Sequence, residues 1–447
     1  MGKNHYNNQI YFKILFTQKL KNKNQKIAII GGGISGIAAS VFLIEKGYKV
    51  DIFETKKTLG GRAGSIKNKN ITVDIGQHIF LPSYKNFLEV LEKLNVKQYL
   101  SIKKKINIPV QDNSKTHYIK SSIPLYPLNL IFSVLNYKNL KFNERLKIIL
   151  GLYKLSKSKD YNSKTSFKSW LEKNGQNNDM IKKFWEIICV PAFNSKLNEI
   201  TMNHAINLFQ IMIFNYKKNI GICYFKKPFS KILNKNFENY IKKNESNLYL
   251  GEKIENIKYS QKKYSLMSKN KNYVYDKVII ATTIGGIKSF DSPTNNKTQN
   301  NNLRTDGIIN IYFWFDKKVT NEDFISFTNS KLEWVFSDNK FRKSNKEYRI
   351  VISLSAVGNL LKVTNQKLIQ EYEKILRKEL NISENIKNIR SLVIRSPKAT
   401  QISTKKINLN HKSRNLYYVG DWTINSLPNT METAALSSKK LINNYFK

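Results

Sequence analysis

Three closely spaced glycines near the start of the chain constrain its fold more than any other feature. They are Gly31, Gly33 and Gly36, with the spacing G-x-G-x-x-G. The apolar run 26–30 precedes them, an amphipathic segment at 37–46 follows, and a second apolar run, 49–53, ends at Glu54. This order predicts a strand, a tight turn, a helix and a second strand. Such a unit binds the pyrophosphate of a dinucleotide at the N-terminus of its helix.

Each part of this turn has a physical role in such a site. The first glycine allows the tight turn, the second lets the backbone approach the pyrophosphate, and the third allows the helix to pack closely on the strand. At the helix N-terminus, Ile34 and Ser35 are expected to offer free N–H groups and a partial positive charge to the phosphates. Glu54 is expected to accept hydrogen bonds from ribose hydroxyls, and an acid there disfavours a 2′-phosphate.

The chain is strongly basic, because 76 Lys and Arg against 32 Asp and Glu give a net charge of +44. One interpretation is a polyanionic partner, either nucleic acid or anionic lipid headgroups. The other is a compositional bias, since Lys is spread along the chain and not gathered in one patch. No helix-turn-helix, RNA-recognition or zinc-finger pattern is present. We therefore expect no nucleic-acid partner, and peripheral contact with an anionic membrane surface stays open.

Cysteine usage and hydropathy bear on the compartment. Two cysteines without a C-x-x-C pair exclude a disulfide framework and a zinc ribbon, and no metal site is expected. The compartment is then a reducing one, so we expect a cytoplasmic protein, peripheral on the inner face of the membrane. Residues 1–25 are expected to form a basic N-terminal extension. The longest apolar run, 27–44, is interrupted by the glycines of the turn and is not interpreted as a membrane span.

A second glycine turn begins five residues after Glu54. It reads Leu59-Gly60-Gly61-Arg62-Ala63-Gly64-Ser65. This segment resembles the G-G-R segment of the flavin amine oxidase and phytoene desaturase superfamily. The resemblance implies FAD as the cofactor, with the backbone at Gly60 and Gly61 passing close to it and Arg62 helping to hold it. The alternative for Arg62 is a surface cation beside a loop.

A segment near the C-terminus is similar to the last part of the same superfamily. An apolar run precedes Gly420 and Asp421, and a helix is expected to open within 427–432. The resemblance implies that Gly420 and Asp421 lie at the ribityl or phosphate region and that the helix start lies against the flavin ring. The expected contacts at the helix start are Asn429, Thr430 and Met431. Ile254, in a strand expected at 247–257, completes the set of cofactor residues.

The resemblance narrows at a motif in the first third of the chain. It reads Asp74-Ile75-Gly76-Gln77-His78. It looks like the D-x-G-Q-H segment of the hydroxysqualene dehydroxylases, FAD-dependent desaturase-like proteins of squalene and hopanoid synthesis. The resemblance implies a cofactor contact at Gly76. His78 is expected to protonate a leaving hydroxyl or to hydrogen-bond the flavin, with Asp74 orienting it. The alternative is a structural hydrogen bond that holds the Gly76 turn.

Three further segments are similar to that family: 184–194, the W-x-F at 334–336, and the ending 420–432. A departure follows the ending, because Ser437-Ser438 stands where the family commonly has Ser-Gly. This departure puts the packing of the last helix at Ser438 in question.

The resemblance implies an α/β fold with two interleaved domains. One is a glutathione-reductase-like, three-layer FAD-binding domain, and the other is an α+β substrate domain with an antiparallel sheet and helices. The expected FAD-binding segments are 26–105, 226–302 and 401–447. The expected substrate segments are 106–225 and 303–400.

The implied activity is reductive dehydroxylation of hydroxysqualene to squalene, in which hydride passes from reduced FAD to an allylic carbon and water leaves. One alternative is an FAD-dependent carotenoid or phytoene-type desaturase, and another is a non-catalytic FAD-containing isoprenoid-binding protein. The expected partner is a long-chain isoprenoid, and the sequence does not identify the electron donor. The uncharged apolar stretch 124–134 is interpreted as tunnel lining or as a membrane-dipping entry for lipid.

Overall fold

The structure is a computed structural model. It describes residues 25–446 apart from 69–70, 104, 122, 124, 160–164, 216–220, 288–302, 338–346, 404–413 and 425. The expected basic extension, 1–25, lies outside the described residues except for Gln25.

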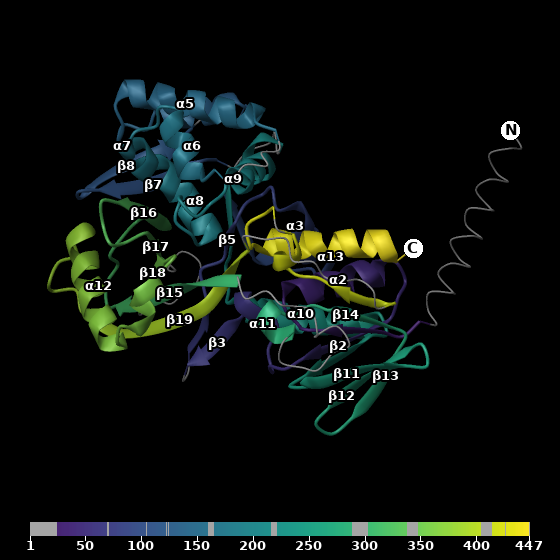
Figure 1. Cartoon of the computed structure of the whole chain (residues 1–447). Helices are drawn as coiled ribbons and strands as arrows, with labels where there is room; N and C mark the ends of the chain where they lie inside the picture. The colour runs from purple at the N-terminus through teal and green to yellow at the C-terminus, as the bar shows by residue number, and fades with distance from the viewer. Residues whose placement is uncertain are drawn as a thin grey trace, which may run out of the picture.

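A five-stranded parallel sheet brings the two ends of the chain together (Figure 1). Its strands, in spatial order, are β10 (Asn247–Leu250), β2 (Val50–Glu54), β1 (Ile27–Ile30), β14 (Lys277–Ile280) and β20 (Leu416–Tyr418). In the centre, Ile27 lies opposite Val50 on one side and Lys277 on the other. All four residues of β1 are buried, which explains why this strand is apolar at every position.

Two different layers cover the two faces of this sheet, as Figure 1 shows. The helices of one face are α2 (Ile34–Glu45), α3 (Lys85–Lys93), α10 (Phe229–Lys243) and α13 (Met431–Tyr445). The other face carries the antiparallel strands β11 (Ile254–Ser260), β12 (Lys263–Ser268) and β13 (Asn272–Tyr275). Ile27 and Ile29 pack against the helices, and Ala28 and Ile30 pack on the opposite side. The predicted three-layer architecture is confirmed.

A seven-stranded sheet forms the second part of the molecule. Its strands, in spatial order, are β19 (Asn388–Ser403), β15 (Leu303–Phe315), β18 (Tyr348–Leu354), β17 (Trp334–Ser337), β16 (Phe324–Thr328), β7 (Asn107–Asp112) and β8 (Lys115–Lys120). All neighbours are antiparallel except β16 and β7. One face packs on α12 (Asn365–Glu379), with Ile311 and Phe313 in that core. Tyr312 and Trp314 lie on the opposite face, beside Val73.

A group of helices packs at one end of the second sheet (Figure 1). They are α4 (Leu128–Leu135), α5 (Phe142–Lys157), α6 (Phe167–Lys173), α7 (Asn178–Met180), α8 (Glu186–Phe193) and α9 (Met202–Phe209). Their shared core contains Trp185 and Phe209, whose ring centroids lie 5.6 Å apart. Within the described residues, no helix combines the length and the apolar character needed to cross a bilayer.

Short elements connect the two parts. They are the hairpin β3 (Ser65–Asn68) and β4 (Ile71–Asp74), the sheet of β5 (Ile79–Phe80), β9 (Ile222–Phe225) and β6 (Leu100–Lys103), and the short helix α11 (Ile284–Ile287). The domain boundaries expected from the sequence place β9 in the substrate domain, at the end of the segment 106–225. In the structure β9 pairs with β5 and β6, and Phe225 packs in the same core as the helices over the parallel sheet.

Two elements differ from their predicted bounds for local reasons. Helix α2 starts at Ile34 and not at Ile37, because the Ile37 N–H already bonds to the Gly33 carbonyl at 3.0 Å. The strand expected at 247–257 is two strands, β10 and β11, since Gly251 takes a φ of +75° and turns the chain between them.

The carboxylate of Glu432, in the first turn of α13, caps the neighbouring helix α3. It accepts hydrogen bonds from the Asn86 and Phe87 backbone N–H groups at 3.2 and 2.9 Å, and from the Asn86 side chain at 2.6 Å. Burial raises the pKa of Glu432, and these bonds partly oppose that rise. Two helices far apart in the sequence are thereby fixed against each other.

We predict that Glu432→Ala lowers the free energy of unfolding by about 2 kcal/mol, because two buried N–H groups lose their acceptor. Urea denaturation followed by circular dichroism measures the loss. The matched control is Glu89→Ala, which breaks an exposed contact to Lys439 and is expected to cost less than about 1 kcal/mol. Equal losses for the two variants would contradict the capping role.

Candidate cofactor site and the adjoining cavities

The first glycine turn contains two glycines that the protein itself requires. The Gly31 N–H bonds to the Phe53 carbonyl at 2.8 Å, and its φ of +115° lies in the region that favours glycine. A Cβ on Gly36 would lie 1.9 Å from the Gly31 carbonyl oxygen. The turn and the helix are therefore in direct backbone contact, as the glycine spacing predicts.

Gly33 is a glycine for a different reason. Its backbone is extended, with φ −76° and ψ −179°, and any residue can adopt that conformation. A Cβ there would meet nothing closer than the Cα of Gly61, 4.0 Å away. The described protein thus leaves the space beside Gly33 open at the N-terminus of α2. That space fits a pyrophosphate, which a side chain would displace.

The second glycine turn packs backbone to backbone on the first. The Gly60 N–H bonds to the Gly32 carbonyl at 2.9 Å, and Gly33 and Gly60 form a parallel bridge. Gly60 and Gly61 have φ values of +101° and +57°. The structure therefore brings the two predicted cofactor turns together.

Glu54 and Ile254 lie at the same end of the parallel sheet. The Glu54 carboxylate accepts hydrogen bonds from the Gly32 and Lys56 N–H groups at 2.7 and 2.8 Å. The Glu252 N–H bonds to the Glu54 carbonyl at 3.0 Å, which brings the start of β11 beside this strand end. Ile254, the first residue of β11, is buried there. Their contacts with a ribose or an adenine stay predictions.

An ion pair joins the second glycine turn to the C-terminal segment. Nη2 of Arg62 lies 2.6 Å from both carboxylate oxygens of Asp421, and Nη1 donates to the Ala399 carbonyl at 3.0 Å. The Asp421 side chain is 6% exposed and that of Arg62 is 38% exposed. Arg62 is therefore not an isolated surface cation. Arg62 and Asp421, which were both predicted to contact the cofactor, therefore form an ion pair with each other.

The C-terminal helix lies against the first glycine turn. Thr430 caps α13 by accepting a hydrogen bond from the Thr433 N–H at 3.2 Å, and Asn429 and Met431 flank this cap. The Gly420 N–H bonds to Ser437 Oγ at 3.0 Å. Helix α13 packs along α2, so the C-terminal segment lies beside the first glycine turn, and its contacts with the cofactor stay predictions.

The serine that departs from the family pattern is accommodated in this contact. Ser438 is fully buried, and its hydroxyl donates to the Ser35 carbonyl in α2 at 2.8 Å. The added hydroxyl therefore has a partner, and it ties α13 to the helix that begins at the first glycine turn.

The D-x-G-Q-H motif forms a buried turn between the two parts of the molecule. Oδ1 of Asp74 accepts hydrogen bonds from Ser65 Oγ at 2.5 Å and from the Phe229 N–H at 2.8 Å. Asp74 therefore anchors the β3–β4 hairpin to α10, which supports a structural role for it. The negative charge of Asp74 also raises the pKa of the His78 imidazole.

His78 carries a buried nitrogen with no partner. Burial lowers its pKa below the ordinary value, and the charge of Asp74 and a hydrogen bond to the Ala63 backbone oppose that fall only in part. Among the described residues nothing hydrogen-bonds to its Nε2 atom. The ring is therefore neutral at pH 7, with one nitrogen available to a ligand.

Asn310, which the sequence analysis missed, carries a second such atom. Its side chain is fully buried on β15, and its Nδ2 donates to the Ile75 carbonyl at 3.1 Å. Its Oδ1 has no partner among the described residues. A Cβ on Gly76 would lie 3.7 Å from His78 Cε1 and 3.9 Å from Asn310 Nδ2, so both side chains flank this turn.

Buried polar atoms without partners are costly and point to a ligand or water at this place. The polar edge of a flavin ring fits these two atoms. A single Asn within the apolar run 308–315 is the signal that could have revealed Asn310.

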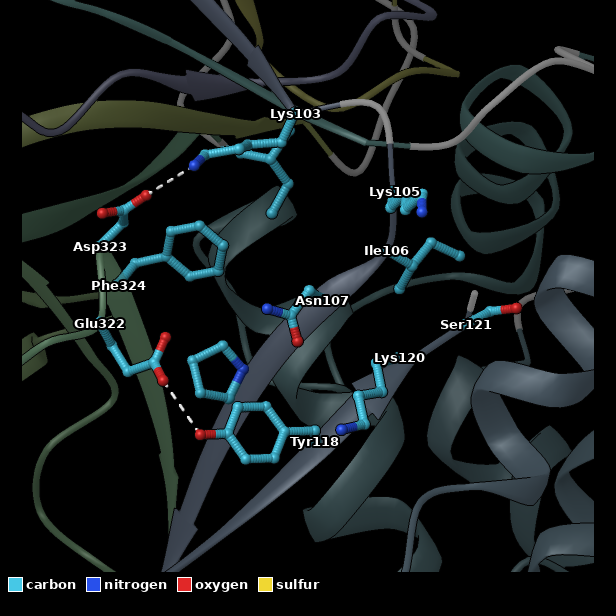
Figure 2. Close-up of a pocket in the computed structure, with 12 residues that line it drawn as sticks. Lys103, Lys105, Ile106, Asn107, Tyr118, Lys120, Ser121, Glu322, Asp323 and Phe324 are labelled. Atoms are coloured by element: carbon cyan, nitrogen blue, oxygen red, sulfur yellow. Dashed lines mark hydrogen bonds and ion pairs between the residues drawn. The ribbon is translucent and has the colours of Figure 1, made fainter. Parts of the chain in front are cut away.

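Two cavities share the side chains of Asp323 and Phe324, and the smaller one adjoins His78. The smaller one, about 30 Å³, is lined by His78, Gln77, Tyr224, several phenylalanines and the acids Asp74 and Asp323. The larger one, about 760 Å³, lies between β6, β7, β8 and the start of β16, as Figure 2 shows. Ligand sites commonly measure about 300–1,000 Å³. The larger cavity is thus wide enough for a substrate.

The larger cavity has a mixed lining. Ile106, Pro109, Ile222 and Phe324 supply apolar surface, and three lysines lie around it. Lys103 is paired with Asp323 at 3.1 Å and Tyr118 donates to Glu322 at 3.0 Å, so part of the charge is neutralised (Figure 2). In the part of the chain that the structure describes, no three His, Cys, Asp or Glu residues gather where they could hold a metal ion.

We predict that Gly33→Val abolishes binding of a flavin nucleotide without unfolding the protein, because the side chain would fill ligand space and its Cβ has no protein atom nearer than 4.0 Å. The bound flavin absorbance and the far-UV circular dichroism of the purified variant measure the two effects. The control is Gly285→Ala, where a Cβ meets nothing closer than 3.9 Å and flavin should be retained. Flavin retained at full occupancy by Gly33→Val would refute the position of the pyrophosphate.

Comparison with known proteins supports this assignment. The family model of flavin containing amine oxidoreductases matches residues 34–440. A zeta-carotene desaturase of Synechocystis is 24% identical over 247 residues, 52% of this chain and 50% of that protein. A 15-cis-phytoene desaturase of Synechococcus elongatus is 27% identical over 153 residues, 33% of this chain and 32% of that protein. The matches thus span about half or less of the length of these relatives.

Solved structures share the fold at low identity. A putative protoporphyrinogen oxidase from Exiguobacterium has a TM-score of 0.69 at 13% identity, with 94% of this chain and 98% of that one covered. A putrescine oxidase bound to putrescine has a TM-score of 0.70 at 10% identity with the same coverage. The family match spans most of the described chain and includes helix α2, the second glycine turn, the D-x-G-Q-H turn and the first ten residues of α13. The chain therefore belongs to the flavin containing amine oxidoreductase family, and its cofactor is FAD.

Proposed function

We propose that the protein is a reductive dehydroxylase that converts hydroxysqualene, a thirty-carbon allylic alcohol, to squalene and water. The observation that carries the proposal is the available Nε2 of His78, a residue that lines a small cavity together with Phe225, Phe324 and Phe336. A polar atom beside phenylalanine side chains suits a substrate with one hydroxyl on a long hydrocarbon. The D-x-G-Q-H motif and the ending at 420–432 support the same substrate class by resemblance.

The reaction adds a hydride to the allylic carbon and a proton to the departing oxygen, so the alcohol is reduced and its oxygen leaves as water. Reduced FAD, when bound, supplies the hydride. His78 holds the proton at Nε2 and delivers it to the hydroxyl. The phenylalanines around it keep out water that would capture a carbocation. The paired turns at Gly33 and Gly60 would hold the FAD diphosphate, and the Asn310 amide oxygen would be available as an acceptor for the flavin ring.

A second candidate is desaturation of a carotenoid, in which hydride leaves the substrate. The observation that favours it is the set of relatives, since zeta-carotene and phytoene desaturases match this chain at 24% and 27% identity. The same His78 nitrogen would then accept a proton from a carbon and not donate one to oxygen. A third candidate, a non-catalytic protein that binds an isoprenoid and keeps FAD, predicts no turnover of either substrate.

Anaerobic turnover separates these candidates. We predict that hydroxysqualene reoxidises the dithionite-reduced protein and yields squalene in equal amount, measured by flavin absorbance and gas chromatography. The Gly33→Val variant is the matched control, because it lacks the cofactor. Consumption of phytoene or zeta-carotene by the oxidised protein, with hydroxysqualene inert, would favour the desaturase. No turnover of any of them would favour the binding protein.

The pH profile tests the role of His78. Because burial lowers the pKa of His78 below 6.5, the imidazolium that donates the proton forms only in acid. We predict that the dehydroxylation rate rises as the pH falls through this lowered pKa, and that His78→Asn reduces the rate about a hundred-fold or more and removes this pH dependence.

His117→Asn is the matched control, because His117 lies on β8 outside both cavities and should leave the rate and its profile unchanged. A desaturase that uses His78 as a base would show the opposite slope, with the rate rising as the pH rises. An unchanged profile in His78→Asn, with flavin retained, would leave His78 with the structural role of holding the Gly76 turn.

A further inference from the structure

Exposed apolar side chains are concentrated in one segment of the chain, the residues just before α4 and the two helices α4 and α5, which are in contact with each other. Fifteen large apolar side chains are exposed among the described residues, and seven of them lie between 125 and 153. They are Leu125, Leu128, Phe132, Phe142, Leu146, Leu150 and Tyr153, between 38% and 63% exposed. We call this surface the α4–α5 face. An apolar cluster of this kind commonly marks an interaction site.

The spacing along α5 places four of these side chains on one side of the helix. Phe142, Leu146, Leu150 and Tyr153 recur at intervals of four, four and three residues. The opposite side, with Ile148 and Leu155, is fully buried in the core of the helical group. Helix α5 is therefore apolar on two sides, and among the described residues only one of them has a partner. Figure 1 shows α5 along the outer edge of the molecule.

The charges of this face are of one sign. Residues 125–159 contain seven basic residues, Lys138, Lys141, Arg145, Lys147, Lys154, Lys157 and Lys159. Their single acid is Glu144, which is 8% exposed and accepts hydrogen bonds from the Lys141 N–H and the Asn177 side chain. Arg145 and Lys157 lie over the rings of Phe142 and Tyr153, at 5.4 and 5.7 Å from their centres. The outer surface therefore combines apolar side chains with uncompensated cations.

We propose that the α4–α5 face docks on an anionic lipid bilayer, with the apolar stripe at the boundary of the acyl chains and the lysines at the lipid phosphates. A helix with an apolar face bordered by Lys and Arg binds at such an interface. A second copy of this chain is a poor occupant, because two such faces would bring their seven basic residues together without acidic partners. Leu125, Leu128 and Phe132, from the apolar stretch that the sequence analysis singled out, are thus exposed, and α5 adds four more such side chains.

The proposal also suits the function proposed above but does not require it. Ser121, which lines the larger cavity, precedes Leu125 by four residues in the chain (Figure 2). Docking by this face would bring the cavity near the bilayer, where a long hydrocarbon substrate dissolves.

Vesicle binding of the full-length, FAD-loaded protein tests the proposal. We expect it to sediment with phosphatidylcholine vesicles that contain phosphatidylglycerol, and much less with phosphatidylcholine alone. Leu146→Glu/Leu150→Glu should weaken this binding by at least about ten-fold, because two apolar anchors are replaced by anions. The matched control is Met267→Glu/Val274→Glu, which makes the same charge change at two exposed residues of the β12–β13 hairpin and should bind nearly as well as the wild type.

The cationic contribution is tested separately with neutral substitutions. Lys147→Gln/Lys154→Gln should lower the affinity for the anionic vesicles by about five-fold for each lysine removed, and raised salt should reduce the difference. Lys262→Gln/Lys271→Gln, at two exposed positions of the same hairpin region, is the matched control and should have little effect. Retained flavin absorbance in every variant shows that the fold is intact.

Three results would overturn the proposal. The first is full binding by the α5 Glu variant, and the second is an equal loss in the hairpin control, which would assign binding to net charge alone. The third is a change of oligomeric state on gel filtration without a change in vesicle binding, which would assign the face to a second copy. Turnover measured in detergent micelles is independent of docking, so failure of the proposed reaction would show there and not in the vesicle assay.

Discussion

The contact between the two glycine turns is the constraint on which the rest of the structure depends. Gly33 and Gly60 meet backbone to backbone, and the Gly60 N–H bonds to the Gly32 carbonyl at 2.9 Å. The second turn requires glycine for this approach, because Gly60 and Gly61 take positive φ values and a Cβ on Gly61 would lie 3.2 Å from the Gly33 Cα. Because the turns sit at the N-terminus of α2, their open side faces the positive end of that helix. The same contact places Arg62 where it reaches Asp421 from the far end of the chain.

The residues around this contact divide into those that build the site and those left available to ligands. Arg62, Asp421, Asp74 and Glu432 are engaged with protein partners, and they fix the C-terminal helix, the β3–β4 hairpin and α3 in place. His78 Nε2 and Asn310 Oδ1 are buried without partners among the described residues. Ionic groups thus supply the frame, and neutral polar atoms face the ligand. In the larger cavity the charges are partly neutralised in pairs, as Lys103 is by Asp323.

Much of the nucleotide-binding part could be predicted from local sequence alone. The strand at 27–30, the turn at 31–36 and the acid at Glu54 form one short unit, whose glycines follow from backbone geometry. The single strand expected at 247–257 was wrong, because Gly251 takes a positive φ and divides it into two strands. Strand β9 could not be assigned from its sequence, because its partners β5 and β6 lie more than a hundred residues earlier in the chain.

The sequence by itself determined the dinucleotide-binding unit at 27–54, since the glycine spacing and the order of strand, turn and helix carry that information locally. The role of the segment at 420–432 in the same site was implied only by resemblance. Only the tertiary structure decided which polar groups are spent on the fold. Asp74 was expected to orient His78 and Asp421 to contact the cofactor, and their hydrogen bonds go to Phe229 and Arg62. The lone Asn310 in an apolar run and the apolar spacing along α5 can be seen in the sequence. Their meaning depends on burial, exposure and unmet hydrogen bonds, which distant segments decide.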